Sequence, residues 1–206
     1  MSWAEALKTF CAMYCATNNP ARWILVGSAA SVLQGAEIEP RDIDIYVNSR
    51  EEVAELSGMM SRYCQEQPSR HPLYRQEWFS SIAEPYRTES YPSGFTWTKG
   101  RWRIGAFPLE VVHIDDSGGI PDSVEGDGIW EGGRYIWEYA KPVAFSGFTI
   151  PVVPLEIQLE SNLRRGREER ARKIAEALKK YGCDEALLAK AISVKHQEYL
   201  RQQGLA

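Results

Sequence analysis

The segment Asp42–Val47, in which acidic or polar residues alternate with apolar ones, limits most strongly how this chain can fold. Successive side chains of a β-strand point to opposite faces, so the pattern predicts a strand with its isoleucines in a core. Asp42 and Asp44 then share the other face. Two neighbouring carboxylates repel each other unless a cation lies between them, and Mg²⁺ fits such a pair. The alternative reading is an edge strand with two solvated aspartates.

A second pattern lies upstream, where the apolar run Trp23–Val26 ends at Gly27-Ser28 and a short helical segment follows over 29–33. The run is typical of a buried strand. A turn between a strand and a helix exposes backbone N–H groups, glycine allows tight reversal of the chain, and the serine hydroxyl can donate a hydrogen bond. We therefore expect Gly27 and Ser28 to hold phosphate, although most connections of this kind have no such role.

A third pattern is the apolar segment 109–114, which an acid interrupts at Glu110. Acids in such segments usually face solvent or pair with a basic residue. If this strand lies beside 42–47, Glu110 completes a cluster of three carboxylates, which can hold two metal ions. The reading thus requires the strands 23–26, 42–47 and 109–114 to be neighbours.

The order of the three patterns resembles the DNA polymerase beta-like nucleotidyltransferase superfamily, and most nearly its small bacterial and archaeal members. The resemblance implies transfer of a nucleoside monophosphate from a nucleoside triphosphate to an acceptor hydroxyl, with release of pyrophosphate. It implies that Asp42, Asp44 and Glu110 are catalytic and bind Mg²⁺, and that Glu110 takes the proton of the acceptor. Gly27 and Ser28 would hold the leaving pyrophosphate. The chain has Glu at the third position, where Asp is commoner in the family.

Basic residues gather at 164–173, within a C-terminal region that we expect to be helical. Arginine binds phosphate through two parallel hydrogen bonds. Arg167, which follows a helix break at Gly166, is our candidate for clamping the triphosphate. The alternative is a solvated helix pair in which glutamates neutralise the arginines.

The remaining elements predict an α/β (α+β) fold, with a small mixed β-sheet flanked by helices and a C-terminal helical segment. On the resemblance this is the nucleotidyltransferase fold, with a catalytic domain over 1–153 and the helical segment over 154–206. The other elements that we expect are helices at 3–17 and 50–65, a hairpin of 95–98 and 101–104 with its turn at Lys99-Gly100, a strand pair at 143–145 and 148–153, and C-terminal helices interrupted at Gly166 and Gly182.

Charge and composition restrict the partners and the compartment. The net charge of -4 argues against broad binding to duplex DNA, which needs a basic face. No apolar run approaches the roughly 18–20 residues of a membrane span, and no signal peptide is recognisable. The four cysteines form no CxxC pair and indicate reduced thiols in a cytoplasmic protein.

Two functions of different classes follow. The first is a nucleotidyltransferase that uses Mg²⁺, a nucleoside triphosphate and an unknown acceptor, which is a small molecule, a protein or an RNA end. The second is a catalytically inactive nucleotidyltransferase-like module, for binding or as an antitoxin. The three acids favour the enzyme, because an inactive descendant has no reason to keep them.

Overall fold

The computed structural model describes residues 1–67, 78–92, 94, 96–115 and 127–205. The strands of these residues belong to one mixed, seven-stranded sheet in the order β3-β4-β5-β2-β1-β7-β6. The chain separates into two compact units, with the boundary inside β1 (Trp23–Val26). The first unit comprises 1–24, the described part of 41–118, and 146–148. The second comprises 25–40 and the described parts of 119–145 and 149–206.

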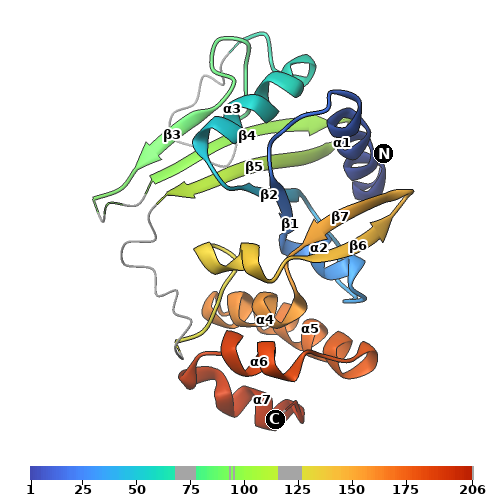
Figure 1. Ribbon diagram of the computed structural model, residues 1–206, viewed down its shortest axis with the longest axis vertical. Coiled ribbons are helices and arrows are strands. Elements are labelled where there is room, and N and C mark those ends of the chain that lie inside the picture. Colours follow the sequence, from blue (N-terminus) through green and yellow to red (C-terminus); the bar gives the residue numbers. More distant parts are fainter. Residues whose placement is uncertain (68–77, 93, 95, 116–126, 206) are drawn as a thin grey trace. The chain divides into compact units, whose positions relative to one another are not determined.

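The first unit is built on strands that pair in both directions. β2 runs parallel to β5, whereas β3, β4 and β5 form antiparallel pairs and lie side by side in Figure 1. In the strand order β2 lies between β5 and β1, which confirms the three neighbouring strands that the sequence predicts. The remaining elements of this unit are α1 (Trp3–Ala16), β2 (Ile43–Val47), α3 (Arg50–Met59), η1 (Ser61–Tyr63), β3 (Arg87–Ser90), β4 (Thr96–Ile104) and β5 (Phe107–Asp115).

Both long helices of the first unit begin at a serine that caps them. The side chains of Ser2 and Ser49 each accept a hydrogen bond from the backbone N–H three residues later, and the carboxylates of Glu5 and Glu52 accept one from the backbone N–H of the capping serine. This capping box satisfies two N–H groups that the helix itself leaves without a partner. It fixes the start of α3 shortly after β2, with Ser49 as the cap.

The predicted hairpin with a turn at Lys99-Gly100 is wrong, because β4 runs unbroken from Thr96 to Ile104. Gly100 serves packing instead of turning: a Cβ there would lie only 2.1 Å from the indole of Trp102, which is fully buried. The chain reverses after Ile104, where Gly105 has a φ of +61° that suits glycine. Because β4 is continuous and antiparallel to β5, its basic residues Lys99, Arg101 and Arg103 lie beside β5.

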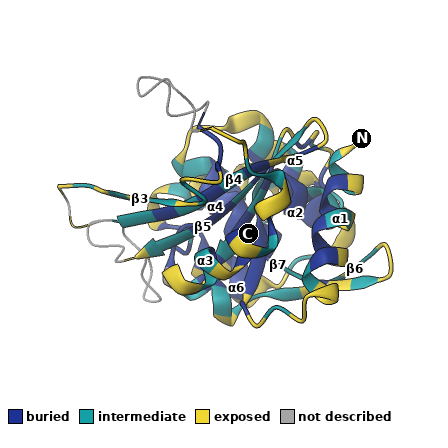
Figure 2. Ribbon diagram, turned by 90° about the horizontal axis from the view of Figure 1, so that it is seen from above, coloured by how far each residue is buried: buried dark blue, intermediate teal, exposed yellow. Residues whose placement is uncertain are grey.

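The core of the first unit lies beneath α1 and α3. Phe10 of α1 meets the ring of Trp23 edge-on at 5.2 Å between centroids, and Tyr14 meets it at 5.8 Å. α3 packs on β2, β4 and β5. Figure 2 shows α1 with a buried side and an exposed side, as expected of an amphipathic helix.

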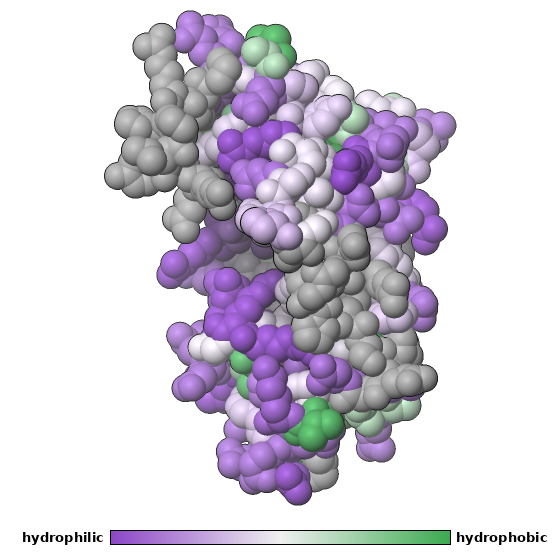
Figure 3. Space-filling view, turned by 90° about the vertical axis from the view of Figure 1, so that its left-hand side faces the viewer, coloured by the Kyte–Doolittle hydropathy of each residue, from purple (hydrophilic) through white to green (hydrophobic). Residues whose placement is uncertain are grey.

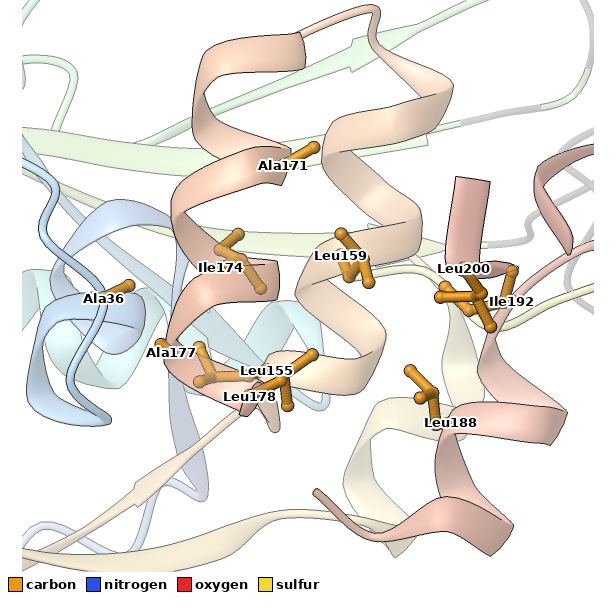
Figure 4. Packing of buried hydrophobic residues seen from close by; sticks show 10 residues of the cluster. All are labelled: Ala36, Leu155, Leu159, Ala171, Ile174, Ala177, Leu178, Leu188, Ile192 and Leu200. Atoms are coloured by element: carbon orange, nitrogen blue, oxygen red, sulfur yellow. The ribbon is translucent and has the colours of Figure 1, made fainter. Parts of the chain in front are cut away.

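The second unit is mainly helical. Its helices gather around the leucine and isoleucine side chains that Figure 4 shows pointing toward one another from α4, α5, α6 and α7. Gly166 and Gly182 end helices at positive φ, +62° and +91°, so both predicted interruptions are confirmed. The elements of this unit, with β7 beginning in the first, are α2 (Gly27–Leu33), η3 (Arg134–Glu138), β6 (Lys141–Phe145), β7 (Phe148–Val152), α4 (Leu155–Arg164), α5 (Glu168–Tyr181), α6 (Glu185–Ala191), η4 (Val194–His196) and α7 (Gln197–Gln203).

Helices alone follow β7 from Leu155 onward, as expected. The two units are interleaved along the chain, and the division into domains at residue 153 stays a prediction. No helix among the described residues is long and apolar enough to cross a membrane.

Candidate active site

Two of the predicted acids stand opposite each other in the first unit. Asp44 of β2 and Glu110 of β5 are register partners in the parallel pair. Partners in adjacent strands lie about 4.8 Å apart and present their side chains on the same face. Asp44 and Glu110 are both half-buried. The fold therefore brings these two carboxylates to one place on the sheet.

A third strand extends this row with a cation. Arg101 of β4 is the antiparallel partner of Glu110, and its Nε lies 4.0 Å from Glu110 Oε2. Asp44, Glu110 and Arg101 thus follow one another across three strands. Sequence reasoning missed Arg101 because it placed the residue just after a turn. The period-two spacing of Lys99, Arg101 and Arg103 is the signal that could have found it.

The surroundings of Glu110 make it a weaker acid. Burial raises the pKa of its carboxyl, and the negative charges of Asp42 and Glu89 raise it further, whereas Lys99 and Arg101 act in the opposite sense. The influence of Asp42 places that residue within electrostatic reach of Glu110, although Asp42 precedes the first residue of β2. A carboxyl group with a raised pKa is suited to proton transfer nearer neutral pH.

The predicted carboxylates are ligands of the kind that Mg²⁺ prefers, but the described residues are not arranged as a complete set of metal ligands. Carboxylate oxygens are the donors that this hard ion takes from proteins. Among the described residues, however, no group of three or more His, Cys, Asp or Glu side chains is close enough to hold an ion. The three predicted acids are therefore not drawn together as ligands. Glu110 faces Arg101 instead, whose Nε lies 4.0 Å from Glu110 Oε2.

The predicted phosphate turn lies in the second unit. Gly27 begins α2 with a φ of +67°, a conformation that favours glycine, and Ser28 is buried behind it. The turn lines a cavity of about 10 Å³, room for roughly one water molecule. The residues that line it are Gly27, Ser28, Ser31, Ile38, Glu131, Asn162, Arg167 and Arg170.

Arg167 is one of the residues that line this cavity. It precedes α5 as its N-cap residue, and its backbone N–H donates to the carbonyl oxygen of Asn162 at 2.9 Å. Arg170, one turn further on, lines the same cavity. The structure thus brings Gly27, Ser28 and Arg167 together, as the sequence reading supposed of a phosphate site.

Glu131 is the second residue that sequence reasoning missed. Its Oε1 accepts a hydrogen bond from the Gly27 N–H at 2.7 Å, and Arg165 Nη1 lies 3.5 Å from Oε2. Its own N–H donates to Ser161 Oγ at 2.7 Å. The residue lies 104 positions from Gly27 in a glycine-rich acidic stretch, where nothing in the sequence distinguishes it from the other acids.

The fold has counterparts among solved structures. A candidate nucleotidyltransferase of Thermotoga maritima matches with a TM-score of 0.53 at 23% identity, over 87% of this chain and 96% of that chain. ANT(2'')-Ia in complex with adenylyl-2''-tobramycin has a TM-score of 0.48 at 14% identity, over 85% and 88% of the two chains. The lincosamide antibiotic adenylyltransferase LnuA, bound to lincomycin, has a TM-score of 0.46 at 17% identity, over 85% and 98%.

No family model matches this sequence, and no curated protein matches it. The Thermotoga maritima structure by itself shows the class of fold: this chain has the nucleotidyltransferase fold, as its resemblance to that superfamily implied.

Proposed function

We propose that this protein is a magnesium-dependent nucleotidyltransferase, which transfers a nucleoside monophosphate from a nucleoside triphosphate to an acceptor hydroxyl and releases pyrophosphate. One observation carries the proposal: within a nucleotidyltransferase fold, Asp44 and Glu110 are register partners on one sheet face, and the charge of Asp42 reaches Glu110. A structural role alone gives no reason to set the carboxylates of Asp44 and Glu110 in register, with the charge of a third acid acting on Glu110.

Asp42, Asp44 and Glu110 are the residues that would hold Mg²⁺. Bound to their oxygens, the ion would neutralise charge on the triphosphate and polarise the α-phosphoryl group, whose phosphorus the acceptor hydroxyl attacks. Glu110 accepts the proton of the acceptor hydroxyl, a task for which its raised pKa makes it a better base once ionised. Gly27 and Ser28 bind the leaving pyrophosphate, and Arg167 stabilises its charge.

The acceptor that we propose is a polar small molecule, or a single hydroxyl of a protein or RNA end. The net charge of -4 disfavours long nucleic acids, which need an extended basic face. The described side chains on the face drawn in Figure 3 are mainly hydrophilic, with apolar ones isolated among them. A wide apolar partner would require a contiguous apolar patch.

Pyrophosphate release tests this function. The wild type is incubated with each nucleoside triphosphate and a fractionated extract of small metabolites, with Mg²⁺ or with a chelator. We expect pyrophosphate release when Mg²⁺ is present and none with the chelator. The rate of release should fall at least about 100-fold in Asp44→Asn, equivalent to ~2.7 kcal/mol of transition-state stabilisation. Glu51→Gln, an exposed acid of α3, is the matched control and should keep full activity.

Release that persists in Asp44→Asn or in the chelator would contradict the assignment of the site. If no triphosphate and no fraction gives release, the inactive binding module becomes the better account of the fold.

A further inference from the structure

The Gly27–Ser28 turn is already hydrogen-bonded to a carboxyl group of the protein itself. The carboxylate of Glu131 accepts the Gly27 N–H at 2.7 Å, and only 2% of Glu131 is exposed. The cavity beside it measures about 10 Å³. Because this is room for roughly one water molecule, the cavity cannot enclose a phosphate group while the side chain of Glu131 stays in place.

Among the described residues, the hydrogen-bond donors and cations that act on the Glu131 carboxylate are groups that would also recognise phosphate. Backbone N–H groups and arginines bind phosphate oxygens as they bind a carboxylate, through charge-assisted hydrogen bonds. From the elements around Glu131 these groups are the Gly27 N–H of α2, Arg165 after α4, Arg167 before α5, and Arg170 within α5.

We propose that Glu131 is a positioning residue that competes with the substrate: its carboxylate holds the Gly27–Ser28 turn and its arginines in place until a triphosphate or pyrophosphate displaces it. The inference rests on the proposed function, because it takes this turn as the phosphate site. One N–H makes one strong hydrogen bond, and two anions at the same donor repel each other. Binding therefore requires the carboxylate to take up a proton and release the Gly27 N–H.

The buried position of Glu131 makes protonation accessible. Burial raises the pKa of this carboxyl, against the opposing effects of Arg165, the Gly27 N–H, Arg167 and Arg170. A phosphate anion arriving beside it raises that pKa further, because a second negative charge favours the neutral acid. Where Glu131 is ionised in the free protein, phosphate binding is thus coupled to proton uptake.

Calorimetry with inorganic pyrophosphate, without metal, tests the competition. Pyrophosphate is titrated into the wild type, Glu131→Gln and Glu168→Gln, near neutral pH and in two buffers of different ionisation enthalpy. We expect Glu131→Gln to bind about tenfold more tightly, ~1.4 kcal/mol, because the neutral amide can leave the N–H without an uncompensated charge. Glu168→Gln removes an exposed charge near Arg167, and solvent screening should keep its effect small.

The number of protons taken up on binding is the measurement that would not change if Glu131 had a purely structural role. With the titration of free pyrophosphate subtracted, the wild type should take up more protons on binding than Glu131→Gln does. If Glu131→Gln fails to give a cooperative thermal transition, uptake by the wild type decides alone, and its absence overturns the inference.

The two possible failures are distinguishable. If the wild type binds pyrophosphate and the folded Glu131→Gln variant binds it equally or more weakly, Glu131 does not compete and the phosphate site itself stands. If neither protein binds pyrophosphate, the Gly27–Ser28 turn is not a phosphate site, and both proposals are wrong on this point.

Discussion

At the scale of single residues, two acids, Glu110 and Glu131, have pKa values shifted in the same direction but have different neighbours. Burial is the main cause that raises the pKa of both Glu110 and Glu131. Glu110 stands in register with Asp44, so its surroundings suit a metal ligand or a base. Glu131 is bonded to Gly27 and Arg165, so its surroundings suit an occupant of an anion site. The two acids thus share burial as the main cause of their raised pKa and differ in the groups that surround them.

Asp42→Asn separates function from folding at the carboxylate site. Its charge raises the pKa of Glu110, so removing the charge relieves repulsion while the amide keeps the shape. We expect the free energy of unfolding to be unchanged within about 0.5 kcal/mol, or slightly higher, and transfer activity to fall at least about 100-fold. Urea unfolding and the pyrophosphate assay measure the two. An unfolded variant, or an active one, would make Asp42 a structural residue.

Glu110→Gln should change how stability depends on pH. The folded pKa of Glu110 is raised, so between its unfolded and folded values the native state binds more protons, and stability falls as pH rises through that window. Glutamine carries no charge at any pH and avoids this loss. We expect the variant to gain stability relative to the wild type above the window, and to show no such gain below the unfolded pKa. A constant difference in urea midpoints across this range would contradict the burial of a charged Glu110.

At the scale of elements, two glycines of the first unit make a matched pair. A Cβ at Gly100 in β4 would lie 2.1 Å from the Trp102 indole, whereas at Gly58 in α3 it would meet nothing within 4 Å. We expect Gly100→Ala to lower the free energy of unfolding by about 1–3 kcal/mol through overpacking. Gly58→Ala should raise it by up to about 0.5–1 kcal/mol, because alanine suits a helix better. Thermal and urea unfolding measure both, and equal effects would contradict the packing of β4.

The same elements show how far the sequence could predict the structure. Local patterns were sufficient for β1, β2 and β5, since apolar runs and period-two alternation are properties of the strand itself. β4 was misread because Gly100 resembles a turn residue, and its true role depends on Trp102, whose position the pattern does not reveal. Glu131 was missed for a similar reason: its contact with Gly27 is set by tertiary folding across 104 positions.

In the candidate site, too, some features could be predicted from local sequence patterns and others depend on tertiary contacts. The adjacency of Asp44 and Glu110 could be predicted, because it needs only two neighbouring strands in one register. The orientation of the acids could not, because it depends on cations such as Arg101 that arrive from another strand. The assignment of Asp42, Asp44 and Glu110 as metal ligands stays a prediction.

At the scale of the whole molecule, charge predicts weak association with nucleic acids. The chain carries 28 acidic and 24 basic residues, for a net charge of -4. We expect a fluorescent duplex of arbitrary sequence to show no binding tighter than about 10⁻⁴ M at physiological salt, the weak end of non-specific binding. Fluorescence anisotropy measures it. Tight binding that weakens steeply with added salt would instead make the basic residues of 164–173 a nucleic-acid surface.

The central claim, nucleotidyl transfer, is tested most directly by the fate of the two ends of the triphosphate. The protein is incubated with Mg²⁺, an acceptor fraction that supports pyrophosphate release, and a nucleoside triphosphate labelled at either the α- or the γ-phosphate. We predict that the α-label alone appears in the acceptor product and that the γ-label leaves as pyrophosphate, with neither transferred by Asp44→Asn. Transfer of the γ-label to the acceptor would contradict the account, because it would make the protein a phosphotransferase.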